Sequence, residues 1–249
     1  MANNSRKKRL DMILLDRGLA ESREQAQSFI MAGLVSVKGQ KATKPGTSFP
    51  QDTDVALAKR KPYVSRGGFK LAHALETFEV DSNGITVLDV GASTGGFTDC
   101  LIQNGARRVY AMDVGKNQIN YRLRHDDRVV VMEGVNAHFP FQLPGIVSMT
   151  TIDVSFISVT KVIPNVLEHL PKHGIILVLI KPQFEAHQSE VGKAGIIRNP
   201  KVHAKVLARI ILWAITNGLR IRNLTPSPIL GARGNREFFL MMEWDKHGI

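Results

Sequence analysis

Short apolar runs alternate with amphipathic stretches along the chain from about residue 85 onward. Apolar runs of about four to eight residues are typical of buried strands, and strands that alternate with helices predict an α/β fold with a mostly parallel sheet. A long amphipathic helix is predicted over about residues 201–217. The seven predicted strands are residues 86–90, 109–112, 129–132, 149–153, 175–180, 219–224 and 238–243, of which the last two form a hairpin that closes the sheet.

The first 60 residues follow a different pattern, which predicts a small α+β unit. A first amphipathic helix ends at Gly18, because glycine readily takes the left-handed conformation that ends helices. A second helix begins after Ser22, whose hydroxyl suits an N-cap, and stops at Gly33. Short apolar runs at residues 34–37 and 55–57 predict strands.

The boundary between these two patterns lies near a proline. Pro62 cannot donate a backbone hydrogen bond, and it biases Lys61 away from helical conformation. We therefore predict a small domain over residues 1–59, a linker over residues 60–66 and a larger α/β domain over residues 67–249.

Composition limits the classes of protein to which the chain can belong. Its hydrophobic content of 43% supports a full core, yet no apolar run reaches the roughly 18 residues of a membrane helix. The sequence contains no secretory signal, and its one cysteine, Cys100, can form neither an internal disulfide nor a cysteine metal cluster. We expect a cytoplasmic, monomeric protein that holds no metal and does not insert into membranes.

Positive charge is concentrated near the N-terminus. The net charge is +11, and the first 66 residues contain 13 Lys and Arg against 6 Asp and Glu. Such an excess points to a polyanion such as nucleic acid, although a charged surface that only maintains solubility remains the alternative. We expect Arg122, Arg124, Arg233 and Arg236 to extend this basic track beyond the first domain.

A glycine-rich turn follows the first strand of the larger domain, in the sequence VLDVGASTGGFT at residues 87–98. Glycines allow close approach of the backbone to a ligand, and the helix that follows offers free N–H groups, so the turn is suited to hold an adenosyl cofactor. It is not the dinucleotide pattern GxGxxG, since Ser93 stands at the second glycine position. An ordinary strand-to-helix connection is the alternative interpretation.

Acidic and amide residues at the ends of the following strands complete the predicted cofactor site. Asp113 can accept hydrogen bonds from both ribose hydroxyls, and Glu133 and Asn136 can face the adenine. The candidate cofactor-binding residues are Asp89, Gly91, Ala92, Ser93, Thr94, Gly95, Gly96, Phe97, Thr98, Asp113, Glu133 and Asn136.

The form DxGxSxGGFT resembles the S-adenosylmethionine loop of class I methyltransferases, particularly the FtsJ-type RNA ribose methyltransferases. That family uses a Lys, Asp, Lys, Glu tetrad to methylate a ribose 2′-hydroxyl, and each member has a match here. The matches are Lys70 in SRGGFKL, Asp153 in TIDVSFIS, Lys181 in LIKPQFE and Glu237 in GNREFF. The resemblance implies S-adenosylmethionine as cofactor, a Rossmann-like fold and these residues as the catalytic set.

The chemistry of ribose methylation agrees with this set, since a hydroxyl is a poor acid whose proton must be withdrawn. A lysine has an ordinary pKa of about 10.4 and acts as a base only where burial or a neighbouring cation lowers it. Lys181 is therefore either the base or the group that orients the hydroxyl, with Asp153 placing it or the methyl donor. Lys70 and Glu237 would hold the substrate. Two further interpretations of the four residues remain. The tetrad could work mainly by positioning the reactants, or the residues could form a pair of salt bridges with a purely structural role.

The first domain resembles the RNA-binding fold of ribosomal protein S4, through its short helix, the segment SREQAQSFIMAGLVSVKG and the strands that follow. The residues expected to contact RNA are Arg6, Lys7, Lys8, Arg9, Arg17, Arg23, Lys38, Lys41, Lys44 and Arg66. The cluster carries this expectation, because a single surface charge contributes little.

Over nearly its whole length the chain resembles the TlyA family, in which an S4-like module is fused to an FtsJ-type methyltransferase. The resemblance implies a 2′-O-methyltransferase of cytidine in ribosomal RNA, with ribosomal RNA or ribosomal subunits as partner. Members of the family are also labelled haemolysins, so a membrane-active protein is one alternative, and a non-catalytic RNA-binding protein is another. A pore former would need a membrane-spanning or amphipathic segment, and none is obvious in the sequence.

Overall fold

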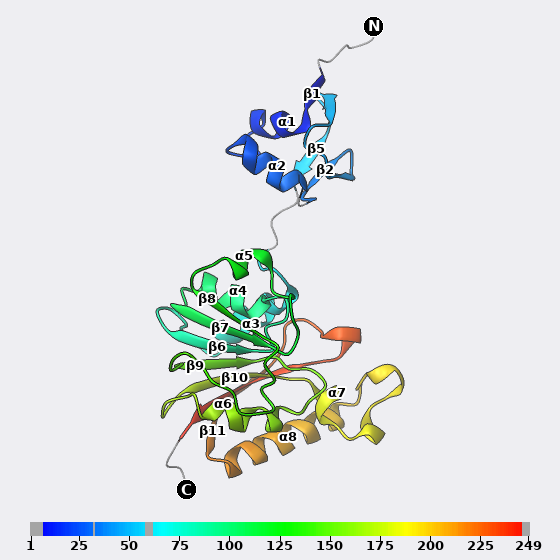
Figure 1. The fold of residues 1–249 in the computed structure, drawn as a ribbon. Coiled ribbons are helices and arrows are strands. Elements are labelled where there is room, and N and C mark those ends of the chain that lie inside the picture. The colour runs from blue at the N-terminus through cyan, green and yellow to red at the C-terminus, as the bar shows by residue number, and fades with distance from the viewer. Residues whose placement is uncertain (1–6, 32, 58–61, 246–249) are drawn as a thin grey trace. The chain divides into compact units, whose positions relative to one another are not determined.

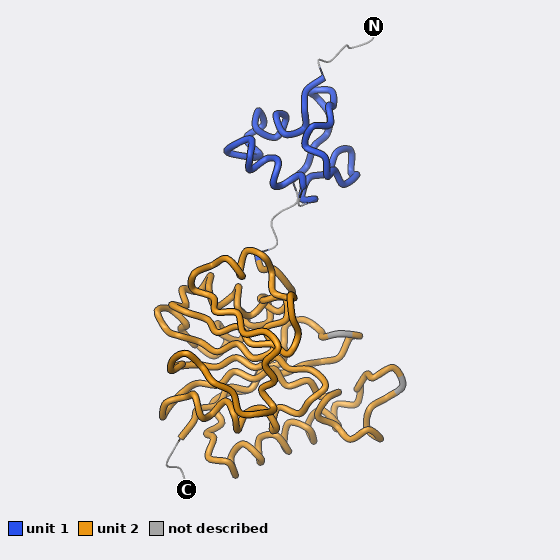
Figure 2. The backbone as a smooth tube through the Cα atoms, in the orientation of Figure 1, with its two compact units in different colours: residues 1–62 blue, residues 63–249 orange. Residues whose placement is uncertain are grey.

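The computed structural model describes residues 7–31, 33–57 and 62–245 (Figure 1). The chain divides into two compact units, residues 1–62 and residues 63–249 (Figure 2). Residues 63–66, which the sequence assigns to the linker, lie in the second unit, where Val64 N donates a hydrogen bond to Asp99 Oδ2 at 2.7 Å. The predicted linker residues 60 and 61 lie outside the described residues.

Among its described residues, the first unit contains two helices and five short strands. Its helices share one hydrophobic core with a three-stranded sheet of order β3-β2-β5, and β1 pairs with β4. The elements are β1 (Lys7–Arg9), α1 (Leu10–Asp16), α2 (Arg23–Met31), β2 (Val35–Val37), β3 (Gln40–Ala42), β4 (Ser48–Pro50) and β5 (Val55–Leu57). The sequence missed β1, β3 and β4, because these strands have no alternating apolar face.

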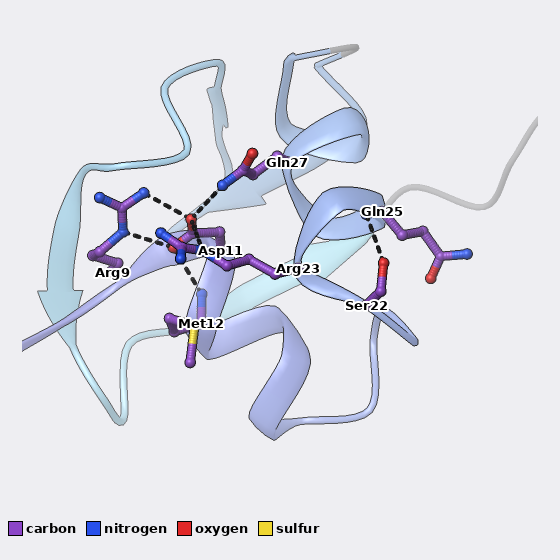
Figure 3. Close-up of polar contacts among 7 residues, drawn as sticks. All are labelled: Arg9, Asp11, Met12, Ser22, Arg23, Gln25 and Gln27. Carbon is purple, nitrogen blue, oxygen red and sulfur yellow. Dashed lines mark hydrogen bonds and ion pairs between the residues drawn. The ribbon is translucent and has the colours of Figure 1, made fainter.

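The predicted end of the first helix and the predicted start of the second helix are both confirmed. Gly18 takes a positive φ of 65° after α1, and Leu19 N donates to Leu14 O at 2.9 Å. Ser22 Oγ accepts a hydrogen bond from Gln25 N at 3.2 Å at the start of α2 (Figure 3).

A buried carboxylate joins the first strand and the two helices. Asp11 is fully buried in α1, and its oxygens accept hydrogen bonds from Arg9 Nη2 at 2.8 Å and Gln27 Nε2 at 3.0 Å (Figure 3). Arg23 Nε donates to the same carboxylate at 3.2 Å. The hydrogen bond from Arg9 is the main reason that the pKa of Asp11 lies well below its usual range.

We expect Asp11→Asn to destabilise the first unit by about 2 kcal/mol, because hydrogen bonds to a charged acceptor are lost and guanidinium groups then face an amide. Calorimetric unfolding of the full chain measures this loss. Tryptophan fluorescence should keep its wild-type transition, since Trp213 and Trp244 both lie in the second unit. Asp52→Asn, at an exposed position of the first unit, is the matched control. A wild-type calorimetric profile for Asp11→Asn would contradict this account.

The second unit is built on one seven-stranded sheet of order β11-β12-β10-β9-β6-β7-β8. All neighbouring pairs from β10 to β8 are parallel, and β12 runs antiparallel to both β10 and β11. The strands are β6 (Thr86–Val90), β7 (Arg108–Asp113), β8 (Val129–Glu133), β9 (Met149–Ile152), β10 (Ile175–Ile180), β11 (Leu219–Pro226) and β12 (Phe238–Trp244). The predicted mostly parallel α/β fold and its closing hairpin are confirmed.

Side-chain alternation along the strands fills two cores, one on each face of the sheet. In β10, Ile176, Val178 and Ile180 belong to one core, while Leu177 and Leu179 belong to the other. The first core includes residues of α6 (Ile163–Leu167) and α8 (Pro200–Thr216), and the second includes residues of α3 (Arg66–Thr77) and α4 (Gly96–Gln103). Helices therefore cover both faces, as Figure 1 shows.

The sheet has a point at which the chain changes direction. From β6 the chain continues outward to β7 and β8, and it then returns to β9 on the other side of β6. In open α/β sheets such a point leaves a crevice at the carboxyl ends of the strands, where ligands bind. Among the described residues, no helix is both long and apolar enough to cross a bilayer.

Candidate active site

The glycine-rich turn after β6 brings two strand ends into close contact. Gly91 has a φ of +85°, and a Cβ placed on it would lie 2.5 Å from the carbonyl oxygen of Asp153. Gly95 has a φ of +90° and is the N-cap of α4. Only glycine satisfies both the backbone conformation and the close approach at position 91.

A cavity of about 320 Å³ opens beside this turn, at the carboxyl ends of β6, β7 and β9. At its rim the carboxylate of Asp113 accepts hydrogen bonds from Ser93 N at 2.8 Å and Gly115 N at 2.7 Å. Asn136 Oδ1 accepts one from His138 N at 3.0 Å, which leaves the amide nitrogen of Asn136 free to donate to a ligand. The apolar lining residues are Val90, Met112, Val114, Val135, Ala137, Val154, Phe156, Ile157 and Val162.

A second cavity, of about 230 Å³, lies on the other side of the same turn. Arg66 and Lys70 from α3 line it together with Asp153. Gly91, Ser93 and Asp153 line both cavities, so the two share a boundary at the end of β6. We call them the larger and the smaller cavity.

The structure separates the predicted cofactor residues into lining and supporting positions. Gly91, Ala92, Ser93, Thr94, Gly96, Phe97, Asp113 and Asn136 line one or both cavities. Four predicted residues, Asp89, Gly95, Thr98 and Glu133, do not line either cavity. Asp89 and Thr98 are fully buried and bonded to each other, and Glu133 pairs with Arg124, which holds the pKa of Glu133 below its usual value.

Asp89 connects three elements below the glycine-rich turn. Its carboxylate accepts hydrogen bonds from Thr98 Oγ1 of α4 at 2.6 Å and from Thr151 Oγ1 of β9 at 2.9 Å. Complete burial raises the pKa of Asp89 to about 6, although both hydrogen bonds act in the opposite direction. The side chain therefore supports the turn from inside the fold.

This raised pKa predicts a pH dependence of stability. An acid with a higher pKa in the folded state stabilises the fold at low pH, and the contribution is lost as the pH rises from 3.8 through about 6. The difference corresponds to about 3 kcal/mol. We expect Asp89→Asn to remove this decline from the free energy of unfolding of the second unit, measured by tryptophan fluorescence in denaturant. The exposed variant Asp81→Asn should keep it, and parallel profiles for wild type and Asp89→Asn would refute the assignment.

The four residues of the predicted tetrad form two ion pairs. Lys181 follows β10 directly, and its Nζ lies 2.6 Å from Asp153 Oδ1 and 2.9 Å from Ser155 Oγ. Lys70 Nζ of α3 lies 2.6 Å from Glu237 Oε2, and both side chains of this second pair are buried. Gly231 leaves room for Glu237, because a Cβ at Gly231 would lie 1.8 Å from Glu237 Oε1.

Nine of the ten predicted RNA-contacting residues fall into three groups, and the tenth, Lys7, is exposed in β1. Arg6 lies outside the described residues. Four residues make contacts within the first unit: Lys8 pairs with Asp16, Arg9 and Arg23 pair with Asp11, and Arg17 donates to the carbonyl oxygens of Gln51 and Thr53. Lys38, Lys41 and Lys44 line a groove beside β3 together with Phe49, and Arg66 lines the smaller cavity.

Sequence reasoning missed several residues that the structure places at the site. Ser155 contacts Lys181, Gln118 lines the larger cavity, and Phe156 is 89% exposed at its rim with a φ of +63°. An exposed aromatic residue three positions after a strand-terminal aspartate was a usable signal for Phe156. Gln118 lies in an irregular loop whose sequence carries no such signal.

Metal ligation is not supported in the part of the chain that the structure describes. No group of three or more His, Cys, Asp or Glu side chains there could hold an ion. Cys100 is buried, and burial raises the pKa of its thiol to about 12.

Comparison with known proteins agrees with this geometry. The FtsJ-like methyltransferase family model matches residues 63–244, and the S4 domain model matches residues 8–50. The 16S/23S rRNA (cytidine-2′-O)-methyltransferase TlyA of Mycobacterium tuberculosis is 39% identical over 96% of this chain and 90% of its own length. Hemolysin A of Brachyspira hyodysenteriae is 42% identical over 92% of this chain and 97% of its own length. A solved structure from Streptococcus thermophilus covers 97% of this chain and 90% of its own, with 41% identity and a TM-score of 0.73.

The fold, the glycine-rich turn and these matches define an FtsJ-like methyltransferase with an S4 domain. Within that class, the similarity extends through both units rather than through the methyltransferase domain alone. The chain belongs to the TlyA family.

Proposed function

We propose that this chain transfers the methyl group of S-adenosylmethionine to the ribose 2′-hydroxyl of a cytidine in ribosomal RNA. One observation carries the proposal. Lys181 Nζ and the Asp153 carboxylate lie 2.6 Å apart, and Asp153 lines both cavities beside the glycine-rich turn. A group held between a cofactor cavity and a substrate cavity is in position to act on the atom that receives the methyl group.

The larger cavity fits S-adenosylmethionine in size and chemistry. Its apolar walls suit an adenine, Asn136 can donate to the base, and the Asp113 carboxylate retains lone pairs for ribose hydroxyls. Gly91 keeps the boundary with the smaller cavity free of a side chain. When bound, S-adenosylmethionine supplies an electrophilic methyl group on a sulfonium.

Lys181 would act on the hydroxyl that attacks this methyl group. Lys181 Nζ is held 2.6 Å from the Asp153 carboxylate, and we propose that it orients the hydroxyl rather than acting as a general base. Lys181 would hold the hydroxyl oxygen and stabilise the negative charge that develops on it, while the hydroxyl proton would pass to solvent water. Asp153 and Ser155 fix the position of Nζ, and alignment of two bound reactants can supply several kcal/mol.

The second ion pair would support the substrate side. Lys70 lines the smaller cavity while its Nζ is held by the buried Glu237 carboxylate, so its position is fixed before substrate arrives. Arg66, exposed at the same cavity, would contact an RNA phosphate. The structure gives both lysines a carboxylate partner, so the positioning interpretation of the tetrad is the one that we adopt.

Ribosomal RNA is the proposed substrate because of the first unit and the relatives. The S4 domain would bind structured RNA through basic residues such as Lys38, Lys41 and Lys44, which line one groove. The Mycobacterium tuberculosis relative is named for methylation of 16S and 23S rRNA. A ribosomal RNA substrate implies action in the cytoplasm.

The test is methyl transfer from tritiated S-adenosylmethionine to separately purified small and large ribosomal subunits that lack the modification. We expect label in the RNA of at least one subunit, with loss of label when the S4 domain groove carries Lys38→Glu, Lys41→Glu and Lys44→Glu together. Absence of label from both subunits, with the cofactor bound to the enzyme, would contradict the proposal.

A further inference from the structure

Two loops carry the proposed reacting pair, and a second set of contacts joins them. Asp153 lies in the loop after β9, and Lys181 lies directly before α7 (Pro182–Glu185). Glu185, at the end of α7, is four residues beyond Lys181. Both of its carboxylate oxygens are bonded to the loop after β9, five to six residues beyond Asp153.

The contacts made by Glu185 are short and use both oxygens. Oε2 accepts a hydrogen bond from Ser158 Oγ at 2.7 Å, and Oε1 accepts one from Val159 N at 2.8 Å. Ser158 also caps the turn at Val159–Lys161, since its Oγ accepts from Thr160 N at 3.3 Å. The carboxylate therefore satisfies a backbone donor at the start of this turn and orients its capping hydroxyl.

The two hydrogen bonds that the Glu185 carboxylate accepts form a bridge between α7 and the loop after β9. Burial raises the pKa of the Glu185 carboxyl, while the hydrogen bonds from Ser158 and Val159 act the other way. The carbonyl oxygen of Glu185 accepts a hydrogen bond from Arg209 of α8, which attaches the end of α7 to the body of the fold. The same two segments are also in contact through Phe156 and Phe184, whose ring centroids lie 4.7 Å apart.

We propose that Glu185 is a positioning residue for methyl transfer, which fixes the loop after β9 so that Asp153 and Ser155 hold Lys181 in its reactive place. The inference rests on the proposed function, because Lys181 and Asp153 are its reacting groups. Glu185 acts through the loop and does not line either cavity. Besides Glu185, the Phe156–Phe184 ring contact and the contacts of Lys181 Nζ with Asp153 and Ser155 join the two segments.

The first experiment measures turnover of full-length variants on ribosomal subunits. Glu185→Ala should lower kcat by about 10- to 100-fold, since small misplacements at a reacting pair have effects of this size. The KM for RNA should stay at the wild-type value. Glu185→Gln should restore most of kcat, because its carbonyl can accept from Val159 N and its amide can donate to Ser158 Oγ.

Two further variants separate this bridge from general effects. Glu190→Ala removes a nearby carboxylate that pairs with Lys205 instead, and it should leave kcat unchanged. Ser158→Ala removes one half of the bridge from the opposite loop, and it should lower kcat by less than Glu185→Ala does. If Glu185→Ala fails to fold, Ser158→Ala still tests the bridge.

Hydrogen exchange gives a readout that does not depend on activity. The Val159 amide is bonded to Glu185, so a peptide covering residues 153–162 should exchange faster in Glu185→Ala and at the wild-type rate in Glu185→Gln. Wild-type exchange and wild-type kcat in Glu185→Ala would overturn the proposal, as would a Glu185→Gln variant as impaired as Glu185→Ala. If wild-type enzyme labels no ribosomal RNA, the proposed function fails, and the exchange result still decides whether Glu185 holds the loop.

Discussion

Lys181→Ala lowers the rate of methyl transfer by about 10²- to 10³-fold in our account and leaves cofactor binding intact. The loss has this size because the side chain is proposed to orient the attacking hydroxyl and to stabilise its developing charge. Lys181 does not line the larger cavity, which is the proposed cofactor site. Its removal therefore does not change the contacts with the adenosyl group. Single-turnover transfer from tritiated S-adenosylmethionine measures the rate, and calorimetric titration with S-adenosylhomocysteine measures binding.

Lys172→Ala is the matched control for this variant. Lys172 is exposed just before β10, whereas Lys181 follows the same strand at its carboxyl end, so both variants lose one positive charge beside β10. We expect Lys172→Ala to transfer methyl groups at the wild-type rate. Turnover retained by Lys181→Ala would remove the proposed role of the tetrad.

Gly91→Ala is expected to weaken cofactor binding and to lower methyl transfer by about 100-fold. The added Cβ would lie 2.5 Å from the carbonyl oxygen of Asp153, so the end of β6 and the loop after β9 must move apart. That movement displaces Asp153 from Lys181, and a shift of about 1 Å at a reacting pair has an effect of this order. Binding and single-turnover assays measure the two losses.

Gly84→Ala separates this overlap from backbone strain. Gly84 has a φ of +71°, similar to that of Gly91, but a Cβ there has no neighbour within 4 Å. Both variants suffer the strain of a left-handed conformation, which is about 1 to 2 kcal/mol. Only Gly91→Ala should lose binding and transfer. Equal losses in the two variants would show that strain, and not the contact with Asp153, explains the effect.

The strands of the larger domain could be predicted because their patterns are local. Residues 175–180 form an uninterrupted apolar run, and residues 86–90 are apolar apart from Thr86 and Asp89. The structure gives β6 and β10 these same bounds. Strand β1 was missed because Lys7, Lys8 and Arg9 have no apolar alternation, and the strand depends on pairing with β4 about 40 residues further along the chain. Non-local pairing of this kind leaves no mark in a short window of sequence.

The candidate site could be predicted to the level of strand ends but not to the direction of side chains. Asp89 and Asp113 both lie near the carboxyl ends of strands that border the glycine-rich turn. Asp89 nevertheless points into the fold toward Thr98, while Asp113 borders the larger cavity. Glu133 instead pairs with Arg124. These outcomes depend on partners from other elements, which the spacing of residues does not specify.

The tetrad was predicted from the resemblance to FtsJ-type methyltransferases. The sequence did not indicate which of its residues form ion pairs with each other. Lys70 and Glu237 are 167 residues apart, and only the packing of α3 against the end of the sheet brings them together. Asp11 illustrates the same limit in the first unit. The sequence predicts that Arg9 and Arg23 belong to a charged RNA-binding surface, while in the structure both form ion pairs with the buried carboxylate of Asp11.

The central claim is that the methyl group reaches a ribose 2′-oxygen of cytidine through the Lys181–Asp153 pair. Digestion of the reacted ribosomal RNA to nucleosides, followed by chromatography and mass spectrometry, tests it most directly. The account predicts that 2′-O-methylcytidine accumulates with wild-type enzyme and forms about 10²- to 10³-fold more slowly with Lys181→Ala. A methyl group found on a base, or 2′-O-methylcytidine formed equally by Lys181→Ala, would contradict it.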